Sequence, residues 1–424
     1  MRRERIAIIG AGISGLGCAR FLDPWHEVTV INDATRPGGH AHTIDVTEPG
    51  TGLRKPMDVG FMVYNEVTYP LLCRLFRELG TRPQPTSMSF SVRHDPSGLE
   101  WSGSSINHLF AQRKNIFRPR HWRLLLQISR FNQLAAEGWK SIEAESTPLA
   151  AWCARHGLGR DFLDLYLVPM SSAVWSTPPE LMLEFPAAKL LRFFHNHGFL
   201  GLHTQHPWLT PGGGSRTYVE ALIQRLRGRV RLGQGAEAVK RSAEGVDVRV
   251  GGQWERYDRV IFATHAPTTC QLLQDISAEE RAVLTPFAFN QNVATVHTDM
   301  SVLPRTPLAR ASWNVRTWDE NSRRLTSTHY WMNSLQGVSD RENYLVSINH
   351  PQQIDPQKVL QTIPSAHPLF SLAALRAQGE VAALNAQPGA RVHFVGAWQR
   401  YGFHEDGLWS AHRLCSQLLG GEPW

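Results

Sequence analysis

The sequence predicts a mixed α/β fold in which a nucleotide-binding domain carries an inserted domain of sheet plus helices. The first observation is an apolar, strand-like run over residues 5–9 that leads directly into a glycine-rich turn and a helix pattern. The second is a strand pattern over residues 27–31, which completes a strand–helix–strand unit. The third is the return of buried-strand patterns at residues 258–264 and 391–396. Together they indicate a Rossmann-like parallel sheet.

The glycine-rich turn has the spacing Gly-x-Gly-x-x-Gly, at Gly10, Gly12 and Gly15. The first glycine permits a tight turn, the second lets the backbone approach a pyrophosphate, and the third lets the helix pack close to the strand. The helix that follows offers free N–H groups and the positive end of its dipole to phosphates. The motif alone is weak, but its place between a strand and a helix predicts that it binds a dinucleotide.

Length and composition exclude several classes of protein. The chain has 424 residues, of which 42% are hydrophobic and 19% charged, as in a folded globular protein. It contains no apolar run of about 18 residues, so no transmembrane helix is expected, and its start lacks the features of a signal peptide. Five cysteines without a Cys-x-x-Cys pair fit a reducing, cytoplasmic location.

The order of the patterns predicts a discontinuous nucleotide-binding domain. We expect it to combine residues 1–80, 210–275 and 385–424. The inserted substrate domain is then made of residues 81–209 and 276–384, with a helical part near residues 105–200.

A basic segment lies in that helical part. Residues 107–139 show a long amphipathic helix pattern, and no acidic residue occurs between Glu100 and Glu137. Six cations and three aromatic residues alternate there: Arg113, Lys114, Arg118, Arg120, Arg123 and Arg130 with Phe117, Trp122 and Phe131. Such a mixture is typical of a helix on an anionic membrane surface, but also of a solvated helix with its aromatics turned inward. The net charge of +7 favours an anionic substrate or a membrane surface, and no nucleic-acid motif is present.

Several motifs together resemble those of FAD-dependent oxidoreductases of the amine oxidase and phytoene desaturase superfamily. Beside the first glycine turn, these are the Gly38-Gly39 pair, the strand over residues 258–264, the strand end at Gly396-Ala397, and Gly407 before a closing helix. The resemblance covers nearly the whole chain. It implies a Rossmann-like FAD-binding domain of the amine oxidase type, with FAD as the cofactor.

A narrower resemblance is to a bacterial group of predicted NAD/FAD-binding proteins. It is carried by Gly38-Gly39-His40 and by residues 58–65, 211–215 and 404–407. Members of this group are associated with cyclopropane-fatty-acid-synthase-like methyltransferases and with the formation of methylated or furan fatty acids. The resemblance therefore implies a fatty-acyl or lipid substrate and a methyltransferase as a neighbour.

The superfamily resemblance also implies which residues contact FAD. Gly10, Gly12, Ile13, Ser14 and Gly15 are expected around the pyrophosphate. An acidic residue normally ends the second strand and binds the ribose hydroxyls, but this chain has Asn32 there, with Asp33 as the alternative. Further contacts are expected from Gly38, Gly39 and His40, from Ala236 beside the adenine, from Ala263, Gly396 and Ala397 at strand ends, and from the backbone of Gly407 and Leu408 at the flavin.

The candidates for proton transfer are few. Tyr64, Tyr401, His404 and Glu405 lie in segments expected near the flavin, and a histidine or carboxylate there could move a proton as a hydride leaves. The alternative is that residues 404–406 cap the last helix. No metal site is expected, because the spacing of His195, His197, His203 and His206 matches no metal motif.

Three functions are compatible with these features. The first is a flavin-dependent desaturase of a fatty-acyl chain, methyl-branched or phospholipid-bound, at the inner membrane surface, with a double-bond isomerase as a close variant. The second is a flavin amine oxidase. The third is a non-catalytic, flavin-bound partner of a methyltransferase.

Overall fold

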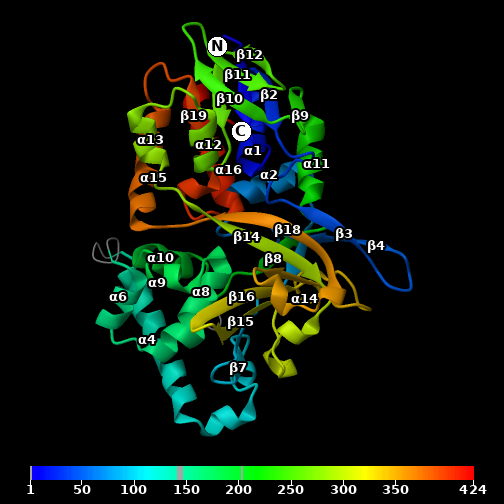
Figure 1. Cartoon of the computed structure of the whole chain (residues 1–424), viewed down its shortest axis with the longest axis vertical. Helices are drawn as coiled ribbons and strands as arrows, with labels where there is room; N and C mark the ends of the chain where they lie inside the picture. The colour runs from blue at the N-terminus through cyan, green and yellow to red at the C-terminus, as the bar shows by residue number, and fades with distance from the viewer. Residues whose placement is uncertain (1, 141–146, 202–203) are drawn as a thin grey trace.

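The computed structural model describes residues 2–140, 147–201 and 204–424, and it confirms the mixed α/β fold (Figure 1). A five-stranded parallel sheet lies in the upper half of the molecule in this view. Its strand order is β19 (Val392–Phe394), β13 (Arg259–Phe262), β1 (Arg5–Ile9), β2 (Glu27–Asn32), β9 (Arg229–Leu232). The predicted strand–helix–strand unit is thus its centre, with α1 (Ile13–Leu22) as the connecting helix.

The alternation of side chains along β1 shows why this sheet is buried on both faces. Ile6 and Ile8 point into one hydrophobic core, where α1 and α16 (His404–Leu419) pack together. Ala7 and Ile9 point into a second core. That core is covered by the antiparallel sheet β10 (Ala236–Arg241), β11 (Val246–Val250), β12 (Gln253–Tyr257) and by the helices α12 (Ala266–Leu272), α13 (Ala278–Leu284) and α15 (Leu372–Asn385). Parallel strands with apolar side chains on both faces require such double cover.

A seven-stranded sheet forms the centre of the lower half (Figure 1). Its order is β18 (Val359–Pro368), β14 (Phe289–His297), β17 (Leu345–Ile348), β16 (Arg323–Trp331), β15 (Trp313–Glu320), β6 (Phe90–His94), β7 (Leu99–Ser102). All neighbours are antiparallel except β15 and β6. Helices pack beside it: α4 (Pro119–Gly138), α6 (Leu149–Arg155), α8 (Val168–Trp175), α9 (Pro179–Leu183) and α10 (Ala187–Asn196). The domain boundaries given above stay a prediction.

Short elements join the two halves. The hairpin β3 (Thr43–Thr47) and β4 (Arg54–Asp58) and the pair β5 (Pro83–Thr86) and β8 (Trp208–Pro211) form two small sheets. The helices α2 (Pro70–Leu79), α11 (Arg216–Arg225) and α14 (Met332–Gln336) lie close to them.

The basic segment is not one helix. It folds as α3 (Ile106–Leu109), the 3-10 turn η1 (Arg113–Phe117) and α4. Pro119 is the first residue of α4, and Arg118 before it is extended (φ −100°, ψ 109°). A residue that precedes proline avoids the helical conformation, so the chain breaks where the amphipathic pattern appears continuous.

Candidate active site

A cavity of about 490 Å³ lies between the two large sheets. One side is formed where the parallel strands end, by Ala11 after β1, Asn32 at the end of β2 and Ala263 after β13. The opposite side is formed by Phe90, Trp313 and other side chains of the seven-stranded sheet. The carboxyl ends of parallel strands are where open α/β sheets bind ligands.

Glycines form the narrow part of this cavity. Gly10 has a left-handed backbone (φ +108°), and a Cβ there would lie 2.6 Å from the carbonyl oxygen of Ala263. A Cβ on Gly15 would lie 3.1 Å from the Ala263 Cβ and would overlap the Gly10 carbonyl, so α1 approaches the strands closely only because residue 15 is glycine. Gly12, Ile13 and Ser14 line the cavity at the N-terminus of α1, where free N–H groups favour a phosphate.

A second glycine strip faces the first. Gly38 donates its N–H to the Ala11 carbonyl (2.7 Å) and pairs with Gly12 as an isolated parallel bridge. A Cβ on Gly39 would lie 3.1 Å from the Gly12 Cα. The two glycine-rich segments are therefore in direct contact, and together they form a part of the cavity wall without side chains, against which a pyrophosphate can lie on backbone groups.

Asn32 and Asp33, at the end of β2, have different roles: the Asn32 side chain bonds to the backbone, whereas Asp33 faces the cavity. The Asn32 amide holds the loop together: Oδ1 accepts from the Ala11 N–H (3.0 Å), and Nδ2 donates to the carbonyls of Ala34 (3.0 Å) and Arg36 (3.3 Å). Asp33 lines the cavity, is exposed, and uses one carboxylate oxygen to accept from the Ala34 N–H (2.8 Å). Its other oxygen is available to a ribose hydroxyl, so the geometry favours Asp33 of the two.

The C-terminal helix begins earlier than expected. α16 starts at His404, and the Gly407 N–H already donates to the Phe403 carbonyl (3.1 Å). Leu408 is fully buried, and a Cβ on Gly17 of α1 would lie 2.9 Å from its Cδ1. The free N–H groups of this helix therefore belong to residues 404–406. This corrects the expectation that Gly407 and Leu408 donate to a flavin, since Gly407 serves instead to let α16 pack against Ile13.

His404 lines the cavity, but its chemistry is that of a neutral ring. Burial lowers its pKa to about 3. It stacks on Phe61 with 3.9 Å between ring centroids, and the Tyr218 hydroxyl lies 2.6 Å from its Nε2. The ring is therefore neutral, and its contact with Tyr218 occupies Nε2, so His404 is a poor base here.

Glu405 and Asp406 act as helix caps. The Glu405 carboxylate accepts from the backbone N–H groups of Leu71 (3.0 Å) and Leu72 (2.9 Å) at the start of α2. Asp406 accepts from the N–H groups of Phe403 (2.9 Å) and Tyr401 (3.2 Å). Burial raises the pKa of Glu405 to about 7 and that of Asp406 to about 6. Neither side chain is among the described residues that line the cavity. Asp406 caps the last helix, as the capping alternative expects, whereas Glu405 caps the N-terminus of α2.

Of the remaining residues that we expected at the site, some line the cavity and others do not. Tyr401, Gly396, Ala397, His40 and Ala263 line the cavity. Tyr64 does not: its ring is buried edge-on against Phe76 (5.0 Å), while its backbone pairs with Leu209 of β8. Ala236 begins β10 opposite Val250 and also lies outside the cavity lining. The structure therefore places the Tyr64 ring away from the cavity. Ala236 follows Gly235, on which a Cβ would lie 2.8 Å from the Asp33 Cβ, so its expected contact with the adenine stays a prediction.

Sequence reasoning missed two cavity histidines. His265 follows β13 and stacks on Phe289 with 4.0 Å between ring centroids, and burial lowers its pKa to about 4. Its place just after a parallel strand is a signal that could have identified it. His367 ends β18, and burial lowers its pKa to about 3. It reaches the cavity only because the second sheet crosses the first, which no local pattern shows.

Lys189 was also missed, and it positions the loop that carries Tyr401. Its Nζ donates to the Arg400 carbonyl (2.5 Å) and to Gln378 (3.2 Å), and lies 4.8 Å from the centre of the Tyr401 ring. Burial lowers the pKa of Lys189 to about 7. A lysine in an apolar helix gives no sequence signal for this role.

The histidines near residue 200 have local partners. His197 stacks on Phe193 (3.9 Å), and His206 Nε2 lies 3.0 Å from the Asn196 carbonyl. His195 lies beside Trp139 at 5.1 Å, and His203 lies outside the described residues. Within residues 2–140, 147–201 and 204–424, no group of three or more metal-binding side chains is found. Within the same ranges, no helix is long and apolar enough to cross a membrane.

Comparison with known proteins identifies the family. Residues 13–284, more than half of the chain, match the model of the flavin containing amine oxidoreductase family, and the chain belongs to that family. It is therefore a flavin-containing oxidoreductase with FAD as cofactor. The sequence has no significant match among curated proteins.

Solved structures share the fold over the full length at low identity. A CLA-producing fatty acid isomerase from P. acnes has a TM-score of 0.69 and 15% identity, with 98% of each chain covered. Cyclohexylamine oxidase from Brevibacterium oxydans IH-35A has a TM-score of 0.66 and 17% identity, with 99% of this chain and 100% of the other covered. An oxidoreductase from Methanosarcina mazei has a TM-score of 0.65 and 15% identity, over 96% and 98%.

The residues present fit FAD. Gly12 and Gly39 line the cavity without side chains, the N-terminus of α1 suits a pyrophosphate, and Asp33 offers a carboxylate to a ribose. From there the cavity continues past Gly396 and Ala397 to His404 at the N-terminus of α16. These residues would hold the cofactor, and bound flavin would supply a hydride acceptor.

Proposed function

We propose that this chain dehydrogenates a fatty-acyl chain, which is bound in the apolar part of the cavity. The observation that carries the proposal is the chemistry of that part. Its lining is aromatic and aliphatic: Met88, Phe90, Met170, Val174, Trp175, Phe193, Phe199, Trp208, Trp313 and Tyr330. Among the described residues that line the whole cavity, Asp33 alone has a carboxylate, and it lies at the opposite end beside Gly12. Such a lining favours a long apolar substrate over an ammonium group.

Dehydrogenation removes a hydride from one carbon and a proton from its neighbour, and the double bond forms between them. His40 is the side chain that we propose to accept the proton. Its Nε2 lies 3.0 Å from the Ala366 carbonyl and therefore carries the hydrogen, which leaves Nδ1 as an acceptor. Burial lowers the pKa of His40, so the ring is neutral at neutral pH, and the unprotonated Nδ1 is the atom that would take the proton. Trp313 and Tyr330, edge-on at 4.9 Å, would hold the chain and exclude water.

An anaerobic absorbance titration tests the substrate class. We expect fatty-acyl phospholipids, methylated or not, to bleach the oxidised flavin band, and amines to leave it unchanged. Bleaching by amines with none by lipids would instead support the amine oxidase alternative, which the family name favours. Turnover of a lipid without any external electron acceptor would support the isomerase variant.

A pair of variants tests the role of His40. His40→Gln should retain FAD absorbance but slow the bleaching by at least about 100-fold, as expected for loss of a general base. His265→Gln is the matched control, because it removes another neutral histidine of the same cavity. Equal loss in both variants, or loss in the control alone, would contradict the assignment. A methyltransferase as partner stays a prediction, and co-purification with such an enzyme tests it.

A further inference from the structure

The end of the molecule farthest from the parallel sheet exposes large apolar side chains. It is formed by α3, η1 and the first turns of α4, drawn in cyan at the bottom of Figure 1, and we call it the basic tip. Phe117 is 85% exposed, and Ile106 and Leu126 are each 68% exposed. Ile116 and Trp122 are exposed as well. Five exposed apolar side chains within 21 consecutive residues are unusual for a surface that contacts only water.

Cations surround these side chains. Lys114, Arg118 and Arg123 are exposed, and their side chains form no ion pair with the described part of the chain. Arg120 is paired with Asp161 (2.6 Å). Since no acidic residue lies between Glu100 and Glu137, the segment itself adds no negative charge. The basic tip therefore presents apolar groups within a positive field.

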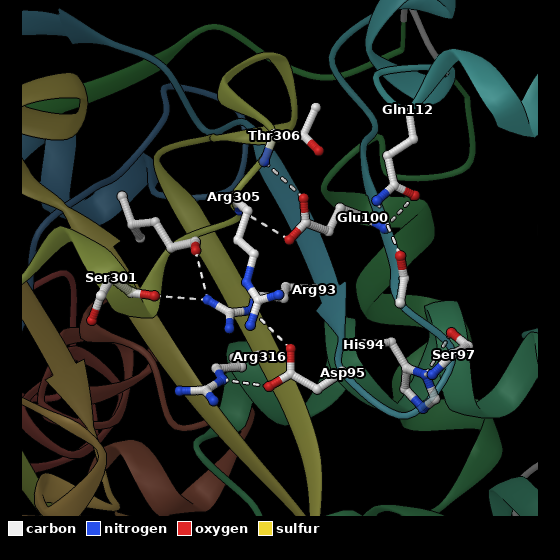
Figure 2. A network of polar contacts seen from close by, with 12 residues as sticks. Arg93, His94, Asp95, Ser97, Glu100, Gln112, Ser301, Arg305, Thr306 and Arg316 are labelled. Carbon is white, nitrogen blue, oxygen red and sulfur yellow. Dashed lines mark hydrogen bonds and ion pairs between the residues drawn. The ribbon is translucent and has the colours of Figure 1, made fainter.

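The tip is held in this conformation by its own polar contacts. The Trp122 indole N–H donates to the Ile116 carbonyl (2.8 Å), and His121 Nε2 lies 3.0 Å from the Leu109 carbonyl. Figure 2 shows how it is fastened to the sheet: Gln112 accepts from the Glu100 N–H (3.2 Å).

The Glu100 carboxylate in turn accepts from the N–H groups of Arg305 (2.9 Å) and Thr306 (2.8 Å) (Figure 2). Beside it, Asp95 accepts from Arg93 and Arg316, each at 2.8 Å. The apolar side chains are thus exposed by a fixed backbone that is tied to the β-sheet.

We propose that the basic tip docks on an anionic lipid bilayer. A bilayer surface accepts apolar side chains into its interface and offers phosphates to the cations around them. A second copy of this chain would match the apolar groups but would bring the same positive charges together, which is unfavourable. Charge complementarity therefore selects the anionic bilayer as occupant. This inference goes beyond the proposed reaction and does not depend on it.

The helix α4, which begins at the basic tip, packs against the wall of the cavity. Phe131 of α4 packs on Phe194 of α10, with 5.9 Å between ring centroids, and its neighbour Phe193 lines the cavity. The helix that begins at the basic tip therefore packs against a helix that lines the apolar part of the cavity.

Vesicle flotation of the FAD-loaded protein tests the proposal. We expect it to float with vesicles that contain phosphatidylglycerol, more weakly with pure phosphatidylcholine, and less in high salt, because salt screens the cations. Phe117→Ser should weaken partitioning about tenfold or more, since it removes one buried aromatic group. Lys114→Gln should weaken binding to anionic vesicles about fivefold and leave binding to neutral vesicles unchanged.

The control is Val67→Ser, which removes a side chain of similar exposure outside the tip and should float like the wild type. An unchanged FAD absorbance and Tm would show that each variant is folded. Equal flotation of wild type and Phe117→Ser, or no flotation with anionic vesicles, would overturn the proposal. The proposal would also be overturned if the wild-type protein formed a dimer that Phe117→Ser dissociates, while neither protein bound vesicles. Since flotation requires no turnover, this failure is distinct from failure of the dehydrogenation hypothesis.

Discussion

Replacing Asn32 with the acidic residue that the family normally has at this position should harm this protein. The Asn32 amide donates from Nδ2 to the carbonyls of Ala34 and Arg36, while Oδ1 accepts from Ala11. Asn32→Asp keeps the acceptor but replaces the donor with a carboxylate oxygen that faces two carbonyl oxygens. The loss of two hydrogen bonds at a half-buried position should cost about 1–3 kcal/mol.

Asp33→Asn is the complementary change. It leaves the contacts of Asn32 intact and removes the charge that faces the cavity. A hydrogen bond from a ribose hydroxyl to a carboxylate is worth about 1.5–3 kcal/mol, so the Kd for FAD should rise roughly 10- to 150-fold. The Tm of the FAD-free protein should change little, because Asp33 is exposed.

Two measurements separate these effects. The increase in FAD fluorescence when the cofactor is released from the protein gives the Kd for FAD. Thermal unfolding of the FAD-free protein gives the Tm. We expect Asn32→Asp to lower the Tm and Asp33→Asn to raise the Kd. Tighter FAD binding by Asn32→Asp with an unchanged Tm, together with an unaffected Kd in Asp33→Asn, would refute the reasoning.

Three further predictions concern other parts of the site. Gly10→Ala should cost about 1–3 kcal/mol and release FAD, because its Cβ would meet the Ala263 carbonyl at a backbone φ of +108°; the flavin content after purification measures this. Tyr64→Phe should leave kcat/KM within about twofold of the wild type, because the Tyr64 ring lies outside the cavity, and steady-state kinetics on the proposed lipid would reveal any larger loss. Burial raises the pKa of Glu405 from 4.5 to about 7. The protonated side chain therefore stabilises the fold by about 3 kcal/mol below pH 4.5, and this contribution is lost as the pH rises to 7. Glu405→Gln should therefore show a smaller fall in Tm from pH 5 to pH 7.5 than the wild type, and an identical fall in both proteins would contradict this assignment.

Local sequence patterns were enough to predict the parallel sheet and the phosphate end of the site. Gly10, Gly12 and Gly15 act within one strand–turn–helix unit, so their spacing alone predicts a close approach of backbone to ligand. The Gly38-Gly39 pair is also a short-range motif, so it can be recognised without knowing which distant segments it contacts. The fold class and the binding of a dinucleotide followed from these short-range patterns, and FAD followed from the resemblance that they carry to the flavin-dependent superfamily.

The roles of the polar residues, in contrast, depend on contacts between distant segments and could not be predicted from local patterns. Asn32 and Glu405 appeared to be ligand-binding or catalytic, but each satisfies backbone N–H groups of another segment, and Glu405 does so across more than 300 residues of sequence. His40, in the turn after Gly38-Gly39, and His367, in β18, come together with 5.1 Å between their ring centroids. Sequence patterns report the periodicity of single elements, whereas burial, pKa and hydrogen-bond partners depend on which elements meet. Which elements contact each other is set by side-chain packing across the whole chain.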